Sequence, residues 1–361
     1  MNFKYIILII FIFTLSLRGQ INNDSIIKGL DGKEINNIAL ENDLKTIMDD
    51  LNIPAISIGI VNDAELVFNK NLGIINLDSN IPVNEKTMFE AASLSKPIFA
   101  YFAMKMVEKG KLDLDKSMFQ YFPHPAIEDK FTETYKKITP RMVLSHSTGF
   151  PNWSEGKKIL LKHEPGNGFS YSGEAYQYLA AVIGNQNGVG YKDDLNEIFL
   201  NEVAKPLNLD HTSFTWNSYL QSHKAYGHQD GKPTDNQNQG KNFGAAYSLH
   251  SNASDYSKFL IAMMKQKDLG QEYFVEMLDE QNHFNEENEL YKNLGQTGWG
   301  LGFAQKKTKD YTMHLHTGNN HDFQSYCMFI PDLRYGIVIF MNTNKMEPFL
   351  ERLTNSLGKQ F

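Results

Sequence analysis

The sequence predicts an α+β fold in which one antiparallel sheet is built from both ends of the chain. Runs of β-branched and aromatic residues cluster near the two ends, whereas the middle carries the apolar patterns of helices. Strands so far apart in the sequence share a sheet when the helical segment between them forms an insertion. We therefore expect a sheet region at about residues 44–92 and 243–361, flanked by helices, and an inserted, mainly helical region at about 93–242.

Five segments have the composition of strands: residues 55–61, 66–68, 313–316, 325–330 and 337–341. Asn62-Asp63 separates the first two segments and Pro331-Asp332 separates the last two, and such residues favour tight turns. We therefore expect an antiparallel hairpin at each end of the chain. Cys327 lies within an apolar run and is expected to be a packed strand residue rather than a nucleophile.

The expected helices lie between these hairpins and at the end of the chain. Residues 98–109 are apolar on nearly every face and stop at Gly110, which predicts a buried helix. Further helices are expected at residues 176–183, 254–265 and about 347–357. Ser254 is the expected N-cap of the second of these. Residues 217–242 are polar with scattered glycine and proline, and we expect an irregular surface segment there.

Composition and charge narrow the classes of function. The 361 residues carry a formal net charge of −7 and no basic cluster, which disfavours nucleic acid as a partner. Residues 1–20 contain Lys4 and then an apolar run over 5–13, which has the length of a secretory signal rather than of a membrane span. We expect export to the periplasm or the medium, with an uncleaved N-terminal membrane anchor as the alternative. Residues 21–361 are expected to form a single domain.

A serine and a lysine stand three residues apart where the first buried helix is expected to begin. Positions i and i+3 of a helix share a face, so Ser93 Oγ and Lys96 Nζ can meet. Pro97 is not tolerated deep in a helix, which places Ser93 in the first turn. The unpaired N–H groups there favour an anionic oxygen. The pattern is also typical of a solvent-exposed, capped helix start, so it does not by itself indicate catalysis.

Three segments occur in an order that resembles a known family. They are residues 89–97 around the serine, Tyr171-Ser172-Gly173, and His316-Thr317-Gly318. They are similar to the nucleophile segment, the Tyr-x-Asn element and the His-Thr-Gly variant of the Lys-Thr-Gly strand in serine β-lactamases and penicillin-binding proteins. The resemblance is to the branch of class C β-lactamases, D-alanyl-D-alanine carboxypeptidases and related esterases, and it extends from about residue 44 to the C-terminal helix.

The resemblance implies an active site in the cleft between the sheet and the helical region. Ser93 would be the nucleophile, Lys96 and Tyr171 would transfer protons, and backbone N–H groups of Ser93 and Asn319 would hold the oxyanion. The expected substrate-binding residues are His316, Thr317, Gly318, Asn319 and Gly173. No cofactor is expected, and the substrate would be a small molecule or a peptide.

Lys96 and Tyr171 admit two protonation schemes. An exposed lysine has a pKa near ~10.4 and becomes a base at neutral pH when burial or a neighbouring cation lowers that pKa. In the alternative scheme, a cationic Lys96 stabilises a tyrosinate at Tyr171. Both schemes lead to an acyl-Ser93 intermediate and remain open from the sequence.

Two positions depart from the pattern of the family. Gly173 replaces the asparagine that helps hold a substrate amide, and His316 replaces the lysine of many relatives. A neutral imidazole would bind a substrate carboxylate less strongly than lysine does, and we expect it to gain a proton between pH 5 and 8. Trp153 is expected either to line the cleft or to pack in the interior. The expected function is an exported serine acyl hydrolase for esters or D-amino-acid peptides, with a β-lactamase and a non-catalytic binding protein as alternatives.

A metal site is a further hypothesis, because His314, His316, His321 and Asp322 lie close together in the sequence. Their spacing is not that of the His-x-His-x-Asp-His pattern of metallo-hydrolases, and the chain has no His-Glu-x-x-His. We therefore expect no metal and place His316 in the cleft. His146 is expected to organise a loop at the junction of the two regions.

Overall fold

The computed structural model describes residues 26–124, 127, 132–235 and 239–358. The expected signal or anchor at residues 1–20 lies outside these ranges. In the described ranges, no helix combines the length and the apolar character needed to cross a bilayer.

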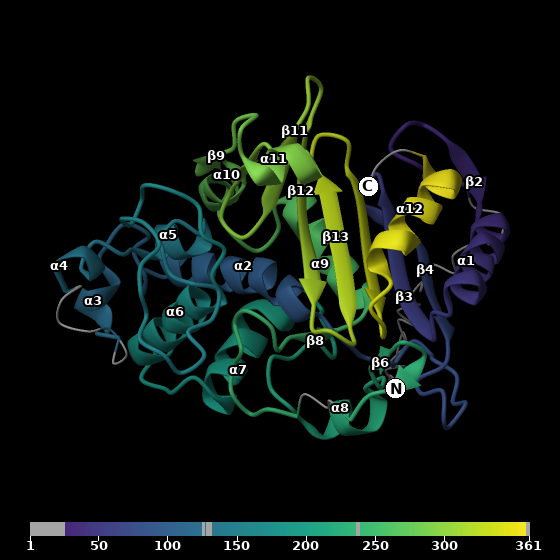
Figure 1. Cartoon of the computed structure of the whole chain (residues 1–361), viewed down its shortest axis with the longest axis horizontal. Helices are drawn as coiled ribbons and strands as arrows, with labels where there is room; N and C mark the ends of the chain where they lie inside the picture. Colours follow the sequence, from purple (N-terminus) through teal and green to yellow (C-terminus); the bar gives the residue numbers. More distant parts are fainter. Residues whose placement is uncertain (1–25, 125–126, 128–131, 236–238, 359–361) are drawn as a thin grey trace, which may run out of the picture.

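An antiparallel sheet, with eight strands among the described residues, occupies the centre of the molecule in the order β4-β3-β14-β13-β12-β11-β10-β9 (Figure 1). The strands are β3 (Ala55–Asn62), β4 (Glu65–Gly73), β9 (Asn282–His283), β10 (Gly298–Trp299), β11 (Ala304–Lys307), β12 (Thr312–Asn319), β13 (Gln324–Ile330) and β14 (Tyr335–Met341). The two ends of the chain meet where β3 pairs with β14, with Ile58 opposite Ile339. The predicted α+β fold, with one sheet assembled from both chain ends, is confirmed.

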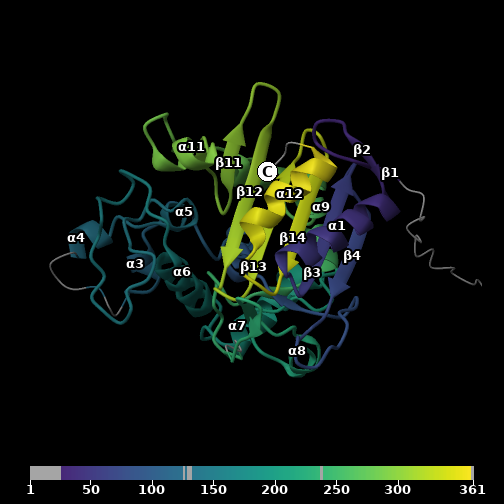
Figure 2. The same cartoon turned by 45° about the vertical axis from the view of Figure 1, so that its right-hand side comes forward.

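Helices cover both faces of the sheet (Figure 2). They are α1 (Asn37–Leu51) and α12 (Met346–Leu357) on one face and α9 (Ala253–Lys265) on the other. The alternation of side chains along β3 separates the two layers, because Ile58 packs in the cluster with α1 and α12 while Ser57 and Gly59 lie under α9. A Cβ on Gly59 would lie 2.3 Å from Ser257 Oγ, so the close approach of α9 requires a glycine in β3.

The helical region lies beside the sheet and is centred on α2 (Figure 1). Its elements are α2 (Ser95–Glu108), α3 (Met118–Tyr121), α4 (Thr132–Tyr135), α5 (Pro140–Leu144), α6 (Gly173–Gln186), α7 (Asp193–Phe199) and a π-helical turn at Leu200–Ala204. Phe99, Tyr101 and Phe102 of α2 are fully buried, which confirms the prediction of a buried helix. This burial fixes the helix that carries the Ser93–Lys96 segment at its start.

Several details differ from the sequence-based expectations. The N-cap of α9 is Asn252 and not Ser254, because the extended Asn252 accepts the Asp255 N–H through its side chain while Ser254 already lies in the helix. The segment 217–242 is less irregular than expected, since it contains α8 (Ser218–His223), β6 (His228–Gln229) and β7 (Lys232–Pro233). The remaining elements are β1 (Ile26–Lys28), β2 (Glu34–Asn36), β5 (Phe89–Glu90), β8 (His250–Ser251), α10 (Gln271–Leu278) and α11 (Glu289–Leu294).

Candidate active site

Ser93 lies at a sharp turn between β5 and α2. It belongs to a 3₁₀ turn, Ala92–Leu94, and the α-helix begins only at Ser95, so the expected position in the first α-helical turn is shifted by two residues. Ala92 has a left-handed φ of 48°, an uncommon conformation for a residue with a Cβ. Ser93 is partly exposed between buried neighbours. The turn therefore presents one hydroxyl to the surface at the helix start.

The end of β12 packs directly against this turn. A Cβ on Gly318 would lie 2.5 Å from the carbonyl oxygen of Ala91 and 3.1 Å from the Ala92 side chain. Ser325, opposite Gly318 in β13, donates its hydroxyl to the same Ala91 carbonyl at 2.7 Å. Gly318 thus allows the strand to approach the backbone next to Ser93, and its predicted role in substrate binding stays a prediction.

Lys96 is buried against Ser93. Its Nζ lies 3.1 Å from Ser93 Oγ and donates a hydrogen bond to the carbonyl of Ala246 at 2.9 Å. The side chain is 1% exposed, and burial lowers its pKa from 10.5 to about 7. A lysine in this state exchanges its proton near neutral pH, which the sequence pattern alone did not establish.

Tyr171 completes a group of three candidate catalytic side chains. Its hydroxyl is hydrogen-bonded with the Ser93 hydroxyl, and Lys96 Nζ lies 4.6 Å from the centre of its ring. Burial raises the pKa of Tyr171 above its ordinary value, an effect that the hydrogen bond with Ser93 partly offsets. Tyr171 directly precedes Ser172, the N-cap of α6, and this helix begins earlier than the expected residue 176. The phenol is therefore held in its neutral form beside the serine.

The ring of His146 packs against the ring of Tyr171. The two rings lie 4.3 Å apart at an angle of 36°, and His146 Nδ1 accepts the N–H of Ser172 at 3.1 Å. His146 is fully buried, with a left-handed φ of 58°. Burial, together with the nearby Lys96 and His316, lowers its pKa well below 6.5. The expected loop-organising role is consistent with these contacts, which orient Tyr171 through a neutral imidazole.

His316 is buried beside Tyr171 and Trp299 rather than open to solvent. It is 3% exposed, and its Nδ1 lies 2.8 Å from the Thr317 carbonyl. Burial, and then the proximity of Lys96, lowers its pKa to about 3. The expectation that His316 gains a proton between pH 5 and 8 is therefore wrong, because the imidazole is desolvated and has no carboxylate beside it among the described residues. It is neutral throughout that range.

The space next to Gly173 is filled by an aromatic ring. A Cβ on Gly173 would lie 2.5 Å from two ring carbons of Trp153. Trp153 is 42% exposed and also contacts the ring of Tyr247, with centroids 5.7 Å apart. At this exposure, the expected interior position is wrong, and a place for Trp153 in the cleft stays a prediction. The indole occupies the place where a larger residue at position 173 would put its side chain.

The outer edge of β12 is open near the serine. Within the described strands, β11 pairs with β12 as far as Leu315, whereas β13 continues to Asn319. Thr317 and Asn319 are exposed. An open strand edge offers backbone N–H and C=O groups to an extended ligand. The predicted residues Thr317 and Asn319 therefore lie on a surface that a substrate can reach.

Sequence reasoning missed a buried ion pair under the Ser93 turn. Glu90 and Lys224 lie 2.9 Å apart with side chains 1% and 2% exposed, and the other carboxylate oxygen of Glu90 accepts a hydrogen bond from Asn320 at 2.7 Å. Burial alone would raise the pKa of Glu90, but Lys224, His250 and Asn320 together outweigh burial and lower it. Glu90 therefore connects the segment before Ser93 both to Lys224 and to Asn320, the residue after Asn319. An isolated lysine 134 residues downstream gives no sequence signal of this contact.

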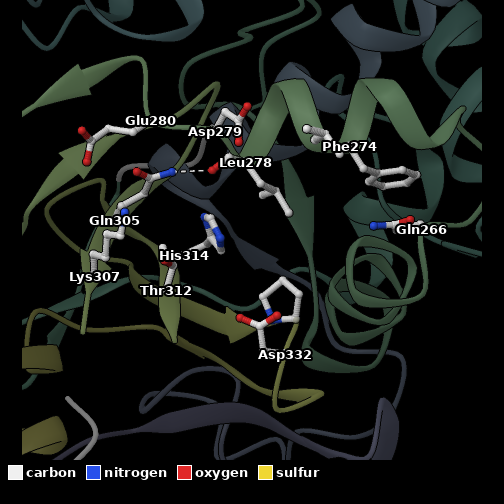
Figure 3. A pocket seen from close by; sticks show the side chains of 12 residues that line it. Gln266, Phe274, Leu278, Asp279, Glu280, Gln305, Lys307, Thr312, His314 and Asp332 are labelled. Carbon is white, nitrogen blue, oxygen red and sulfur yellow. Dashed lines mark hydrogen bonds between the residues drawn. The ribbon is translucent and has the colours of Figure 1, made fainter. Parts of the chain in front are cut away.

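A cavity of about 320 Å³ lies near Thr312 and His314 of β12, away from Ser93 (Figure 3). His314 points into it beside Leu278, while Glu280 and Asp332 lie on different sides of it. The cavity is lined by neither Ser93, Lys96 nor Tyr171. It is therefore separate from the group of candidate catalytic side chains described above.

The residues of the metal hypothesis do not converge. His314 is buried against Phe303 and Phe329, His321 is exposed, and Asp322 accepts a hydrogen bond from Thr234. In the ranges that the structure describes, no three His, Cys, Asp or Glu side chains lie close enough together to hold a metal ion. The geometry thus gives no support to a metallo-hydrolase built on residues 314–322.

Sequence comparisons place the chain among known proteins. Residues 40–357 match the family model described as Beta-lactamase. Protein flp of Staphylococcus aureus is 24% identical over 333 residues, which cover 85% of this chain and 63% of that protein. The chain thus aligns with less than two thirds of the length of that relative. A Beta-lactamase of Yersinia enterocolitica is 23% identical over 350 residues, covering 86% of this chain and 87% of that protein.

Solved structures share the same fold. The D-alanine carboxypeptidase AmpC from Burkholderia cenocepacia superposes with a TM-score of 0.72 at 20% identity, covering 89% of this chain and all of that one. The octameric penicillin-binding protein homologue from Pyrococcus abyssi also gives a TM-score of 0.72, at 21% identity, covering 89% of this chain and 77% of that one. At these identities the superpositions show the fold.

Proposed function

The chain belongs to the beta-lactamase family, whose members are serine hydrolases, and from this premise we propose that it hydrolyses esters or D-amino-acid peptides through an acyl-Ser93 intermediate. The observation that carries the proposal is the meeting of Ser93 Oγ with Lys96 Nζ at 3.1 Å and with the Tyr171 hydroxyl. A serine becomes a nucleophile when an adjacent base takes its proton, and the two candidate bases lie in hydrogen-bond reach.

Neutral Lys96 is the base in the proposed first step. With a pKa of about 7, a large fraction of Lys96 is unprotonated at neutral pH, whereas the raised pKa of Tyr171 opposes a tyrosinate. The Ser93 proton moves to Lys96 Nζ as Oγ forms a bond with the substrate carbonyl carbon, and the carbonyl electrons move to the oxygen. Backbone N–H groups of Ser93 and Asn319 are proposed to stabilise that oxyanion.

The tetrahedral intermediate then collapses to the acyl-enzyme. The bond to the leaving group breaks, and the proton held by Lys96 passes through the Tyr171 hydroxyl to the leaving oxygen or nitrogen. Deacylation repeats the sequence with water. Water gives a proton to the Tyr171 and Lys96 pair, its oxygen attacks the acyl carbon, and Ser93 Oγ leaves with the proton.

Two features support esters over β-lactams. Trp153 fills the space beside Gly173, so the site has no side chain there to hold a substrate amide. His316 is neutral because its pKa is about 3, so it offers no positive charge to a substrate carboxylate. A β-lactamase is the alternative activity. A non-catalytic protein is the less supported alternative, since Ser93, Lys96 and Tyr171 are all retained in contact. We also propose that the protein is exported, on the pattern of residues 1–20.

Intact-mass spectrometry with three probes tests the proposal. The protein is incubated with a fluorophosphonate, a penicillin and p-nitrophenyl acetate, and adducts are located by peptide mapping. We expect a stoichiometric fluorophosphonate adduct on Ser93, turnover of the ester, and slow or no turnover of the penicillin. Ser93→Ala serves as the control, and it should lose hydrolysis and labelling while its thermal midpoint stays close to that of wild type.

Two results would overturn the proposal. One is hydrolysis by Ser93→Ala above a few per cent of the wild-type rate, which would exclude Ser93 as the nucleophile. The other is a folded wild-type protein that neither reacts with the fluorophosphonate nor turns over any of the probes, which would favour the non-catalytic alternative.

A further inference from the structure

An apolar cavity of about 180 Å³ lies next to the candidate active site, between α11 and the edge of the sheet. Leu290 and Leu294 of α11 form one wall, and Trp299 of β10 lies in another. Tyr171 and Thr317 also line the cavity. The cavity is thus bounded by two residues of the candidate site itself.

The walls favour an uncharged occupant. They are mainly aliphatic and aromatic, with Gln296 and Thr317 as polar members, and the residues that line the cavity include no Asp, Glu, Lys or Arg. His316, which also lines it, is neutral with a pKa of about 3. Burial of a charged group without a partner is strongly unfavourable, whereas burial of each methylene group is favourable. An anionic substituent would therefore be rejected here.

The volume sets the size of the occupant. An apolar protein cavity of about 150 Å³ binds benzene, so a cavity of this size holds a group of about six carbon atoms. The cavity is one residue away from the nucleophile, because Tyr171 lines the cavity and its side chain is hydrogen-bonded with Ser93. Thr317, which also lines the cavity, is exposed and directly precedes Gly318, the residue that packs against the Ser93 turn.

We infer that this cavity binds an uncharged apolar chain of about six carbon atoms, so that the natural substrate is a neutral ester carrying such a chain. The inference rests on the proposed function and narrows its substrate class. The chain belongs either to the acyl group or to the alcohol, and both share the same chemistry. The experiments below separate these two sources.

Chain-length series in the acyl group and in the alcohol test the inference. kcat/KM is measured for p-nitrophenyl acetate, butyrate, hexanoate and decanoate, and, by pH-stat, for ethyl, butyl, hexyl and decyl acetate. In one of the two series, kcat/KM should rise by about fourfold per methylene group up to six carbon atoms, which is on the order of a hundredfold in total, and then fall. If kcat/KM does not change with chain length in either series, the inference is wrong.

Variants of α11 show whether this cavity causes the preference. Leu294 is exposed and lines the cavity, so the larger side chain of Leu294→Trp can fill it. This variant should lower the ratio of kcat/KM for six-carbon to two-carbon substrates at least tenfold. Leu290→Ala enlarges the cavity and should shift the optimum to a longer chain. Asn293→Trp adds the same bulk on an exposed part of α11 that does not line the cavity, and it should keep the wild-type ratio. A ratio that changes equally in Leu294→Trp and Asn293→Trp would refute the assignment.

A binding measurement separates failure of the inference from failure of the proposed function. Hexyl acetate and p-nitrophenyl hexanoate are titrated into Ser93→Ala, with and without Leu294→Trp, by isothermal calorimetry. Saturable binding that Leu294→Trp weakens at least tenfold supports the cavity even when the wild-type protein turns over no ester. Hydrolysis of esters with flat chain-length series, and no binding by Ser93→Ala, would reject the cavity and leave the proposed function standing.

Discussion

Replacement of Lys96 by methionine is expected to abolish hydrolysis and, at pH 7, to make the protein more stable. Methionine fills nearly the same volume without a polar group to desolvate. The side chain of Lys96 is fully buried, and burial lowers its pKa from 10.5 to about 7. The proposed catalytic base therefore lowers the stability of the folded state, and methionine removes this cost.

The size of the effect follows from the pKa shift. Between pH 7 and 10.5 the unfolded chain binds a proton at Lys96 that the folded chain does not. The lowered pKa therefore reduces the free energy of unfolding fully below pH 7, and this reduction disappears above pH 10.5. The cost is about 4 kcal/mol at pH 7 and about 2 kcal/mol at pH 9, at about 1.36 kcal/mol per pKa unit. The variant also loses the hydrogen bond to the Ala246 carbonyl, and this loss destabilises it by about 1 to 3 kcal/mol. The net gain at pH 7 is about 1 to 3 kcal/mol.

Urea unfolding of wild type and Lys96→Met at pH 7, 8 and 9 measures this difference. The advantage of the variant should shrink by about 2 kcal/mol from pH 7 to 9, because only the wild type becomes more stable over that interval. Lys157→Met, at an exposed lysine, is the control and should change the free energy of unfolding by less than about 0.5 kcal/mol at each pH. A difference between wild type and Lys96→Met that is independent of pH would refute the reasoning.

Three further predictions concern the same site. The kcat/KM of wild type for a neutral ester should rise about tenfold per pH unit below pH 7 and level off above it, as Lys96 loses its proton, and a flat profile from pH 5 to 8 would contradict a neutral lysine base. Gly173→Asn should destabilise the protein by about 1 to 3 kcal/mol, because its Cβ would lie 2.5 Å from Trp153. The loss measured by urea unfolding should be smaller in a Trp153→Ala background, and equal losses in the two backgrounds would contradict this explanation. Gly318→Ala should lower kcat by about 10² or more, because its Cβ would displace β12 from the Ala91 carbonyl, and an unchanged kcat would show that this close approach is not needed.

The parts of the site that lie close together in the sequence were predictable. Ser93 and Lys96 are three residues apart at a helix start, and Pro97 limits where that helix begins, so their contact at 3.1 Å follows from helical geometry. The helix that follows Tyr171 was also expected from a local apolar pattern, although it begins at Gly173 rather than at residue 176. The long apolar runs near the chain ends likewise predicted strands that the structure contains. The division of the chain at residues 92 and 243 stays a prediction.

Short elements and exact helix starts were less predictable. The strands β9 and β10 have two residues each, and their pairing depends on neighbours in the sheet rather than on a run of strand-forming residues. The start of α9 depends on whether Asn252 or Ser254 takes the extended backbone conformation, and both residues are good N-caps. Local preference alone does not choose between them.

The fold class, the family and the candidate catalytic residues could be predicted from the sequence, because they depend on periodic patterns and on contacts a few residues apart. The protonation states of those residues depend on the tertiary structure. The pKa of Lys96 and of His316 depends on desolvation by segments far away in the chain, which bring His146, Trp299 and the Ala246 carbonyl to the site. The same packing fixed His316 as neutral, against the expectation drawn from the ordinary pKa of histidine. Burial is a property of the assembled molecule, and a side chain's charge follows its burial.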